Sequence, residues 1–255
     1  MKLFASDIDN TLVPQKEELV KEDVRELEEA LAEAVDVKVA YISGRNFSLM
    51  QEVLANYYLP QPDFLATDVG TLIYVFDGED WKPDEDYRDH LALTGYDKKE
   101  LEQKLKEIPG LSRQEEEVQT EFKLSYYLDL ESKQDSLPRI RKAVAESPAQ
   151  LIYSEDRVKE VGLVDVIPEA GGKAGALDFL AQKLEAGNHE VIYAGDSGND
   201  LNALNAGYNG IVVGNASEEL RKNLEDNSCI YMAQNDFSSG VVEGIKYFLK
   251  NNFNK

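Results

Sequence analysis

Short apolar segments, each followed closely by acidic or small polar residues, most constrain how this chain can fold. The segments are Leu3–Ala5, residues 37–42 (VKVAYI) and residues 191–194 (VIYA), and they are followed by Asp7, Ser43 and Asp196. Runs with helical periodicity lie between them, and this alternation of strand and helix indicates a parallel sheet with crossover helices. Because the carboxyl ends of parallel strands share one edge of the sheet, we expect these polar residues to meet there.

The remaining periodic segments extend this pattern and divide the chain into two parts. The first part is expected to contain helices over 17–35, over 173–184 and from residue 239, and strands over 64–67, 72–76 and 211–213. The second part begins with a turn-rich stretch and indicates helices over 97–108 and 136–146 and strands over 122–130 and 151–153. We therefore predict an α/β fold, a Rossmann-like parallel-sheet core of residues 1–77 and 164–255 with an inserted α+β domain over 78–163.

The composition is acidic, with 49 Asp and Glu against 27 Lys and Arg and a net charge of −22 over 255 residues. The excess is spread along the chain and forms no acidic tail. Such a negative field repels phosphate polymers, so neither nucleic acid nor an anionic membrane is an expected partner. No stretch approaches the roughly 18 apolar residues of a membrane-spanning helix, and no targeting segment is visible. We expect a cytoplasmic monomer.

Cysteine and histidine are scarce, which limits the kinds of metal site. The chain has one cysteine, Cys229, and two histidines, His90 and His189. A single cysteine excludes an intramolecular disulfide, and this set excludes zinc sites built from several Cys or His ligands. Any metal would therefore be a hard ion held by oxygen atoms.

Two candidate motifs lie in the N-terminal part of the chain. Asp7 and Asp9 follow the first strand, where one carboxylate could attack a phosphorus atom while the other handles a proton. A turn rich in Asp and Asn that caps a helix is the alternative interpretation. Ser43, Gly44 and Arg45 follow the second strand and could bind an anion with a hydroxyl and a backbone N–H, or form an ordinary helix cap.

Two more candidate motifs lie in the last third of the chain. Lys173, in GGKAGAL, opens an amphipathic helix and could neutralise a phosphoryl group, although an ordinary surface lysine fits the same pattern. Asp196 and Asp200 flank a tight turn in GDSGND and could hold Mg²⁺, which binds a few carboxylates together with water and substrate oxygens. A plain Gly/Asp/Asn turn is the alternative. All of these groups can meet at the carboxyl edge of one parallel sheet, which favours a common site over four unrelated turns.

The segments DIDNTLV, SGR, GGKAGAL and GDSGND resemble, in the same order, the four motifs of the haloacid dehalogenase (HAD) superfamily of phosphatases. The insert resembles the C2B cap of the Cof-type branch. Within that branch, VGTLIY, FKLSYYLD, VDVIP and GDSGNDLNAL resemble the sucrose-phosphate phosphatases. Ala174 departs from the pattern, because the branch usually has glycine after the lysine, whereas Ser43 keeps the hydroxyl that relatives often supply as threonine.

The resemblance implies a role for each motif residue. Asp7 would be the nucleophile that forms an aspartyl-phosphate, Asp9 the general acid and base, and Thr11 the residue that orients Asp9. The phosphate would be held by Ser43, Gly44, Lys173 and Asn199, and Mg²⁺ by Asp7, the carbonyl of Asp9 and Asp196, with support from Asp200. Lys173 would also neutralise charge at the nucleophile.

Substrate choice is expected to lie with the cap and with the loops that face it. Gln119 and Lys123 lie on or near the strand FKLSYY, and their amide and ammonium donors suit sugar hydroxyls. Arg45, Gly70 and Thr71 are the other expected sugar contacts. The alternative for the cap residues is that they decorate one face of a sheet.

These expectations together point to a Mg²⁺-dependent phosphatase acting on a sugar phosphate, with sucrose 6-phosphate as the first candidate. A glucosyl- or mannosyl-3-phosphoglycerate phosphatase, or a Cof-type phosphatase of broad specificity, would use the same chemistry. Two other classes are open, a phosphotransferase like the phosphomannomutases and a non-catalytic module that binds sugar phosphates. The intact set of Asp7, Asp9, Lys173 and Asp196 argues against the last of these, since a binding module has no need of a nucleophile.

Overall fold

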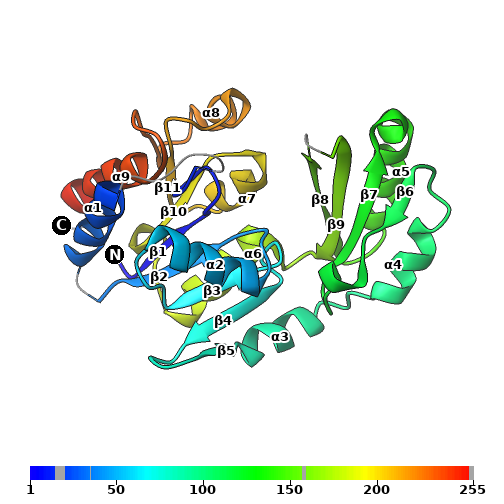
Figure 1. The fold of residues 1–255 in the computed structure, drawn as a ribbon, viewed down its shortest axis with the longest axis horizontal. Helices are drawn as coiled ribbons and strands as arrows, with labels where there is room; N and C mark the ends of the chain where they lie inside the picture. The colour runs from blue at the N-terminus through cyan, green and yellow to red at the C-terminus, as the bar shows by residue number, and fades with distance from the viewer. Residues whose placement is uncertain (15–20, 35, 157–158, 253–255) are drawn as a thin grey trace. The chain divides into compact units, whose positions relative to one another are not determined.

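The computed structural model describes residues 1–14, 21–34, 36–156 and 159–252. The chain divides into two compact units (Figure 1). The first unit combines Met1–Asp84 with Lys173–Lys255, and the second is Glu85–Gly172. The second unit is therefore an insertion in the sequence of the first.

The first unit is built on an eight-stranded sheet with the order β12-β11-β10-β1-β2-β3-β4-β5. Its strands are β1 (Leu3–Ser6), β2 (Lys38–Ile42), β3 (Phe64–Thr67), β4 (Leu72–Phe76), β5 (Trp81–Pro83), β10 (Val191–Gly195), β11 (Asn209–Val212) and β12 (Ile230–Met232). The strands from β12 to β3 pair in parallel, and β4 and β5 continue the sheet antiparallel. The predicted α/β fold with a parallel-sheet core is confirmed.

Six α-helices of the described residues belong to this first unit. They are α1 (Lys21–Ala32), α2 (Phe47–Tyr57), α6 (Gly172–Lys183), α7 (Leu201–Leu204), α8 (Glu218–Leu224) and α9 (Phe237–Asn252). Helix α1 buries Val24, Leu27 and Leu31, and it lies beside α9 (Figure 1). In the predicted helix over 17–35, residues 17–20 and 35 lie outside the described residues.

The core of the first unit lies around its central strands. All four residues of β1 and all five of β10 are buried. This explains why these segments read as continuous apolar runs, since strands covered on both faces lose the alternation of a half-exposed strand. Each large apolar side chain buried there contributes about 1.5–3 kcal/mol to folding.

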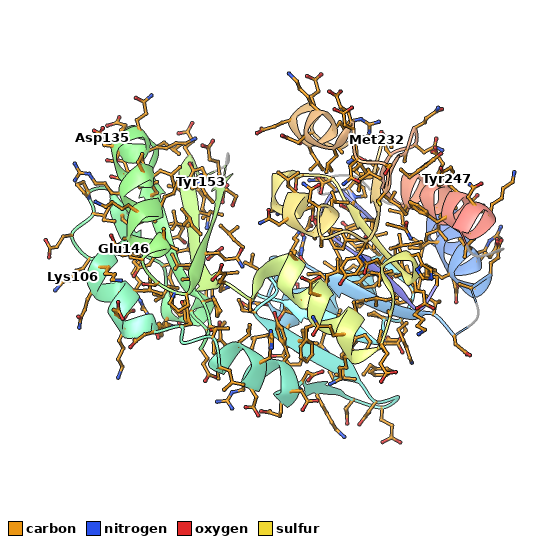
Figure 2. All side chains as sticks on the ribbon, turned by 180° about the vertical axis from the view of Figure 1, so that it is seen from behind. Lys106, Asp135, Glu146, Tyr153, Met232 and Tyr247 are labelled. Atoms are coloured by element: carbon orange, nitrogen blue, oxygen red, sulfur yellow. The ribbon has the colours of Figure 1, made fainter. Side chains whose placement is uncertain are left out.

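The second unit packs helices on one face of a four-stranded antiparallel sheet with the order β6-β7-β9-β8. Its elements are α3 (Glu85–Ala92), α4 (Lys98–Leu105), β6 (Leu111–Arg113), β7 (Leu124–Asp129), α5 (Lys133–Ala145), β8 (Ala149–Asp156) and β9 (Val161–Pro168). Its core cluster joins residues of α4 and α5 with Leu124, Tyr126 and Val164 of the sheet. Tyr153 of β8 packs against this cluster (Figure 2).

The boundaries between the units differ from the expected ones. We expected the insert over 78–163, whereas the second unit is Glu85–Gly172. At the first boundary, β5 pairs with β4, which keeps residues up to Asp84 with the first sheet. At the second boundary, β9 pairs with β7 and β8 as far as Pro168, so this segment completes the second sheet and does not resume the first.

Among the described residues, no helix combines the length and the hydropathy that crossing a membrane requires.

At Gly244, helix α9 packs closely against the sheet. A Cβ atom at this position would lie 2.5 Å from Cγ1 of Ile211, a fully buried residue of β11. We expect Gly244→Ala to lower the free energy of unfolding by about 1–3 kcal/mol because the core is overpacked, although alanine is the better helix former. Urea unfolding measures this value.

The matched control is Lys246→Ala, an exposed position two residues along the same helix. It should change the free energy of unfolding by less than about 0.5 kcal/mol. A Gly244→Ala protein as stable as the wild type would show that α9 does not pack this closely on β11.

Candidate active site

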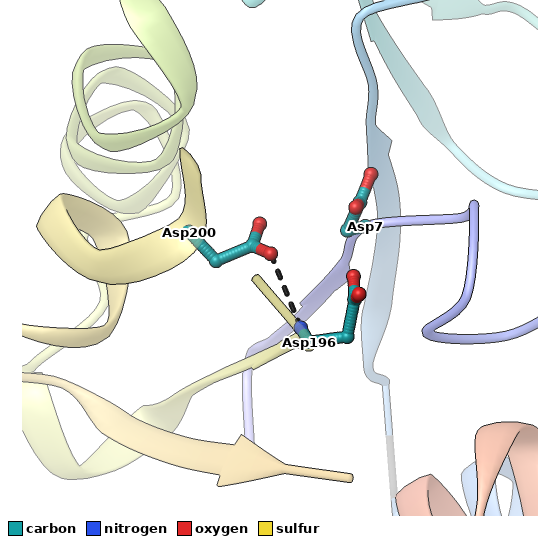
Figure 3. Close-up of side chains that lie close together, drawn as sticks. All are labelled: Asp7, Asp196 and Asp200. Carbon is teal, nitrogen blue, oxygen red and sulfur yellow. Dashed lines mark hydrogen bonds between the residues drawn. The ribbon is translucent and has the colours of Figure 1, made fainter. Parts of the chain in front are cut away.

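Three buried carboxylates converge at the carboxyl edge of the first sheet (Figure 3). Oxygen atoms of Asp7, Asp196 and Asp200 lie within 4.8 Å of one another. Asp7 follows β1 and Asp196 follows β10, and these two strands are parallel neighbours in which Ser6 pairs with Ala194. Continued by one residue, this register puts Asp7 opposite Gly195, which directly precedes Asp196, so the two aspartates lie at the same edge of the sheet.

Lys173 supplies the positive charge at this cluster. Its Nζ lies 2.9 Å from Oδ2 of Asp7 and 2.7 Å from Oδ1 of Asp200, and its side chain is 3% exposed. Burial by itself acts to lower the pKa of Lys173, but the carboxylates of Asp200 and Asp7 outweigh it and raise that pKa above its ordinary value. The lysine is therefore charged under all ordinary conditions.

The aspartates carry more negative charge than one lysine balances. Burial, together with the neighbouring Asp200 and Asp196, raises the pKa of Asp7 from 3.8 to about 8 against the opposing effect of Lys173. Burial and Asp200 likewise raise the pKa of Asp196 to about 7. Both shifts indicate that a further cation would stabilise the ionised cluster. A set of carboxylate oxygens is what a hard divalent ion such as Mg²⁺ prefers, so the donor set fits that ion.

Asp200 accepts hydrogen bonds through both of its carboxylate oxygens. Its Oδ1 accepts from Lys173 Nζ and from the Tyr193 hydroxyl, each at 2.7 Å. Its Oδ2 accepts from the backbone N–H groups of Asp196 and Ser197, each at 3.1 Å (Figure 3 shows the first of these). A carboxylate has about four lone-pair positions, so direct ligation of a metal by Asp200 would cost one of these bonds. The geometry gives Asp200 a supporting position.

Gly195 leaves space for the Asp200 side chain. A Cβ atom at Gly195 would lie 2.6 Å from both Cβ and Cγ of Asp200. Only glycine therefore lets the turn Gly198–Asp200 fold back over the end of β10 and present Asp200 to Lys173.

Asp9 is held by Arg45 in a bidentate ion pair. The Nε and Nη2 atoms of Arg45 donate to the two carboxylate oxygens of Asp9 at 2.8 and 2.7 Å. We expected Thr11 to orient Asp9, but the fully buried Thr11 hydroxyl donates to Oδ1 of Asp196 at 3.0 Å. The reason is direction: Thr11 points toward the loop after β10, whereas Asp9 extends toward the loop after β2.

The loop after β2 carries the expected phosphate-binding groups. Ser43 is 1% exposed, and its hydroxyl oxygen accepts the backbone N–H of Arg45 at 3.2 Å. Gly44 is exposed, with open space where a side chain would begin. A ligand can therefore approach the backbone of Gly44 closely.

A strained turn after β3 braces this loop. Asp68, Val69 and Gly70 all have positive φ angles, of 52°, 63° and 77°. The Asp68 N–H donates to the carbonyl of Arg45, and the Val69 N–H donates to the carbonyl of Ser43. A left-handed β-branched residue costs on the order of 1–3 kcal/mol, and such strain persists only where surrounding contacts fix it.

One pocket of about 420 Å³ brings most of the predicted groups together. Predicted residues in its lining are Asp7, Asp9, Ser43, Gly44, Arg45, Lys173, Asp196 and Asn199. Asn10, Leu49 and Ser197 also line it and were not predicted, although Asn10 and Ser197 lie inside the quoted motifs. All of these residues belong to the first unit.

Gly70 and Thr71, expected as sugar contacts, are not in the lining of this pocket. Thr71 is 1% exposed, and its hydroxyl donates to the carbonyl of Asp68 at 2.8 Å. The structure therefore gives Thr71 a part in the strained turn. The side chain is committed to the backbone of its own loop, which the sequence pattern does not reveal.

The two expected sugar contacts of the second unit differ in their surroundings. The Gln119 amide donates to the carbonyls of Gln114 and Ser125 at 3.1 and 2.9 Å and accepts the Ser125 N–H at 2.9 Å. These bonds fix the chain before β7 and use both hydrogens of the amide, so Gln119 could donate to a sugar only by breaking one of them. Lys123 is 6% exposed and lies at the start of the same strand region.

Comparison with known proteins identifies the family. The profile of the family described as sucrose-6F-phosphate phosphohydrolase matches residues 1–249. The chain belongs to this family. It is a HAD-superfamily phosphomonoesterase, as the motifs predicted.

Alignments with individual relatives cover nearly all of this phosphohydrolase. A HAD-like hydrolase of Nitrosococcus oceani is 33% identical, in an alignment that covers 96% of this chain and 71% of the relative. The mannosylfructose-phosphate phosphatase of Agrobacterium fabrum is 28% identical, with 97% of each chain covered. The structure of the sucrose-phosphatase of Synechocystis sp. PCC6803, in complex with sucrose and phosphate, superposes with a TM-score of 0.82 at 27% identity, covering 97% of each chain.

The raised pKa of Asp196 gives a test of the charge balance. Because this pKa is about 7 in the folded protein and 3.8 ordinarily, the folded state binds more protons than the unfolded chain between these values. The contribution of Asp196 to stability in the absence of metal therefore falls as the pH rises through this window. Asp196→Asn cannot ionise, and it should reduce the loss of stability between about pH 5 and pH 7.

Urea unfolding in a chelator, across this range of pH, measures the effect. Asp36→Asn removes an exposed carboxylate of the same unit and should keep the wild-type dependence on pH. If the free energy of unfolding changed equally with pH in the wild type and in Asp196→Asn, the pKa of Asp196 would not be raised in the folded protein.

Proposed function

We propose that this phosphohydrolase is a Mg²⁺-dependent sugar-phosphate phosphatase that converts sucrose 6-phosphate to sucrose and phosphate through an aspartyl-phosphate on Asp7. The observation that carries the proposal is the position of Asp7. Its buried carboxylate is paired with Lys173 and lines an open pocket that Asp9 also lines. A nucleophile and a second carboxylate in one pocket match the two steps that phosphate-ester hydrolysis through a covalent intermediate requires.

In the first step, an oxygen of Asp7 forms a bond to phosphorus, and the bond from phosphorus to the sugar oxygen breaks. Asp9, in its protonated form, gives its proton to the leaving sugar oxygen. In the second step, Asp9 takes a proton from water, whose oxygen attacks the phosphorus and releases phosphate and Asp7. Since Arg45 binds both oxygens of Asp9 in the structure, protonation of Asp9 requires that this ion pair loosen.

The phosphoryl oxygens would be held by four groups around the same pocket. These are the Ser43 hydroxyl, the Gly44 N–H, the Lys173 ammonium and the Asn199 amide. Lys173 already contacts the Asn199 side chain at 3.2 Å, so both can turn toward one ligand oxygen. Fixed donors of this kind stabilise the charge that develops on the transferring group.

The metal ion would be held by the carboxylates of Asp7 and Asp196 and by the carbonyl of Asp9. Asp200 would support this set through its hydrogen bonds to Lys173 and to the backbone of Asp196. When bound, Mg²⁺ supplies positive charge that lets a carboxylate approach a phosphate dianion. Burial and the neighbouring carboxylates raise the pKa of Asp7 and of Asp196, and this supports the assignment.

The second unit would act as the C2B-type cap that selects the sugar. Lys123 is the proposed sugar contact in this unit, and Arg45 is the proposed contact from the first. Gln119, Gly70 and Thr71 are weaker candidates because of the bonds and positions described above. The similarity to the sucrose-phosphatase of Synechocystis sp. PCC6803, whose structure contains sucrose and phosphate, supports a disaccharide phosphate as substrate.

A second substrate is favoured by one specific observation. The mannosylfructose-phosphate phosphatase of Agrobacterium fabrum matches this chain over 97% of each sequence. Mannosylfructose phosphate is therefore the alternative disaccharide phosphate.

A panel of substrates tests the proposal. Release of inorganic phosphate is followed for sucrose 6-phosphate, mannosylfructose phosphate, glucosyl-3-phosphoglycerate and simple hexose phosphates. A kcat/KM highest for sucrose 6-phosphate supports the first candidate, and a flat profile supports a phosphatase of broad specificity. Appearance of an isomerised sugar phosphate in place of free phosphate would replace hydrolysis by transfer.

Asp7→Asn tests the nucleophile. The amide has the shape of the carboxylate but is a poor nucleophile, so kcat/KM should fall at least about 10³-fold. The variant should stay folded by circular dichroism, because it removes a charge from a crowded cluster. The exposed Asp36→Asn should keep wild-type activity, and substantial activity in Asp7→Asn would contradict the assignment.

Metal removal tests the cation. A chelator should abolish phosphate release, and excess Mg²⁺ should restore it. Because ionised carboxylates bind the ion, Mg²⁺ should raise the thermal midpoint more at about pH 8 than at about pH 6. Asp196→Asn should weaken this stabilisation, and full activity in a chelator would refute the requirement for metal.

A further inference from the structure

Tyr193 is a buried polar side chain that the reaction described above does not use. It lies in β10, two residues before Gly195, and is fully buried. Its partners across the two neighbouring strands are Ala5 and Gly210, two of the smallest residues. The other residues of β10 up to Ala194 are apolar, so a strand of this kind has no structural need for a hydroxyl.

The Tyr193 hydroxyl donates to Oδ1 of Asp200 at 2.7 Å. The same oxygen accepts a hydrogen bond from Lys173 Nζ at 2.7 Å, and this Nζ lies 2.9 Å from Oδ2 of Asp7. A continuous series of contacts therefore leads from Tyr193 through Asp200 and Lys173 to Asp7. Every member of this series is buried, where hydrogen bonds to a charged group are strongest.

The shared oxygen gives this contact a consequence beyond packing. With both donors present, Oδ1 of Asp200 divides its negative charge between the tyrosine hydroxyl and the lysine ammonium. Without the hydroxyl, Lys173 would be the remaining donor to that oxygen among the described residues, and Asp200 would attract it more strongly. The ammonium would then neutralise Asp7 less.

We propose that Tyr193 is a positioning residue of the phosphatase reaction, which holds the Asp200 carboxylate so that Lys173 stays on Asp7. This inference rests on the proposed role of Asp7 as the nucleophile. Tyr193 is not in the lining of the pocket, so it acts through Asp200 and Lys173 and not by contact with the substrate.

Tyr41 offers a matched control in the same sheet. It lies in β2, is fully buried, and its hydroxyl donates to the carbonyl of Pro60 at 3.0 Å. Removal of either hydroxyl deletes one hydrogen bond made by a buried tyrosine of the parallel sheet. The two positions differ in the acceptor, which is a charged carboxylate of the catalytic cluster for Tyr193 and a neutral carbonyl for Tyr41.

The experiment compares Tyr193→Phe and Tyr41→Phe with the wild type in steady-state phosphate release with saturating Mg²⁺. The best substrate from the panel is used. Activity is expressed per folded molecule, with the folded fraction taken from circular dichroism at the assay temperature. We expect kcat of Tyr193→Phe to fall roughly tenfold or more, the loss of one hydrogen bond to a charged group, with KM within about twofold of wild type. Tyr41→Phe should keep both parameters while also losing thermal stability.

A selective loss of kcat in Tyr193→Phe supports the positioning role. Wild-type kcat in Tyr193→Phe, a parallel rise in KM, an equal loss in Tyr41→Phe, or failure of Tyr193→Phe to fold overturns it in favour of ordinary packing. Inactivity of the wild-type protein on the whole panel is a different result, since it would refute the proposed function itself.

Discussion

The contact of Lys173 with Asp7 and Asp200 is the interaction on which the rest of the site depends. One buried ammonium lies 2.9 Å from the first carboxylate and 2.7 Å from the second. Charges buried to this degree persist only when they are paired and hydrogen-bonded. Since Asp7 follows β1, Asp200 follows β10 and Lys173 opens α6, the pairing joins three distant segments at one point of the sheet edge. The same crowding of carboxylates makes this edge a place for a further cation.

The parallel sheet sets the frame for this cluster, and small backbone features complete it. Three neighbouring strands, β10, β1 and β2, end at the same edge and deliver Asp196, Asp7 and Ser43 to it. Gly195 lets Asp200 fold back over β10, and the left-handed turn after β3 braces the loop that carries Ser43. The phosphatase site is therefore an outcome of strand order and turn geometry as much as of residue chemistry.

Much of this could be predicted from the sequence, because strand ends and motif order are local properties. The apolar runs before Asp7, Ser43 and Asp196 were sufficient to place these residues at one edge. The side-chain partners were harder to predict. Thr11 contacts Asp196 and not Asp9, and Gln119 is bound to the backbone beside β7. The limits of the second unit also shifted, since β5 and β9 each continue a sheet that periodicity alone does not assign.

The sequence by itself determined the chemical groups, their order along the chain and the sheet edge at which they meet. It did so because burial leaves a pattern in the apolar residues, and because strands in a parallel sheet end on the same side. Only the tertiary structure decided which acceptor each donor reaches. The bond from Thr11 to Asp196 joins residues 185 positions apart, and that from Tyr193 to Asp200 depends on how one turn folds back over its strand. A hydrogen bond requires its two atoms to lie about 3 Å apart, and no pattern in the sequence fixes a distance so short across so much chain.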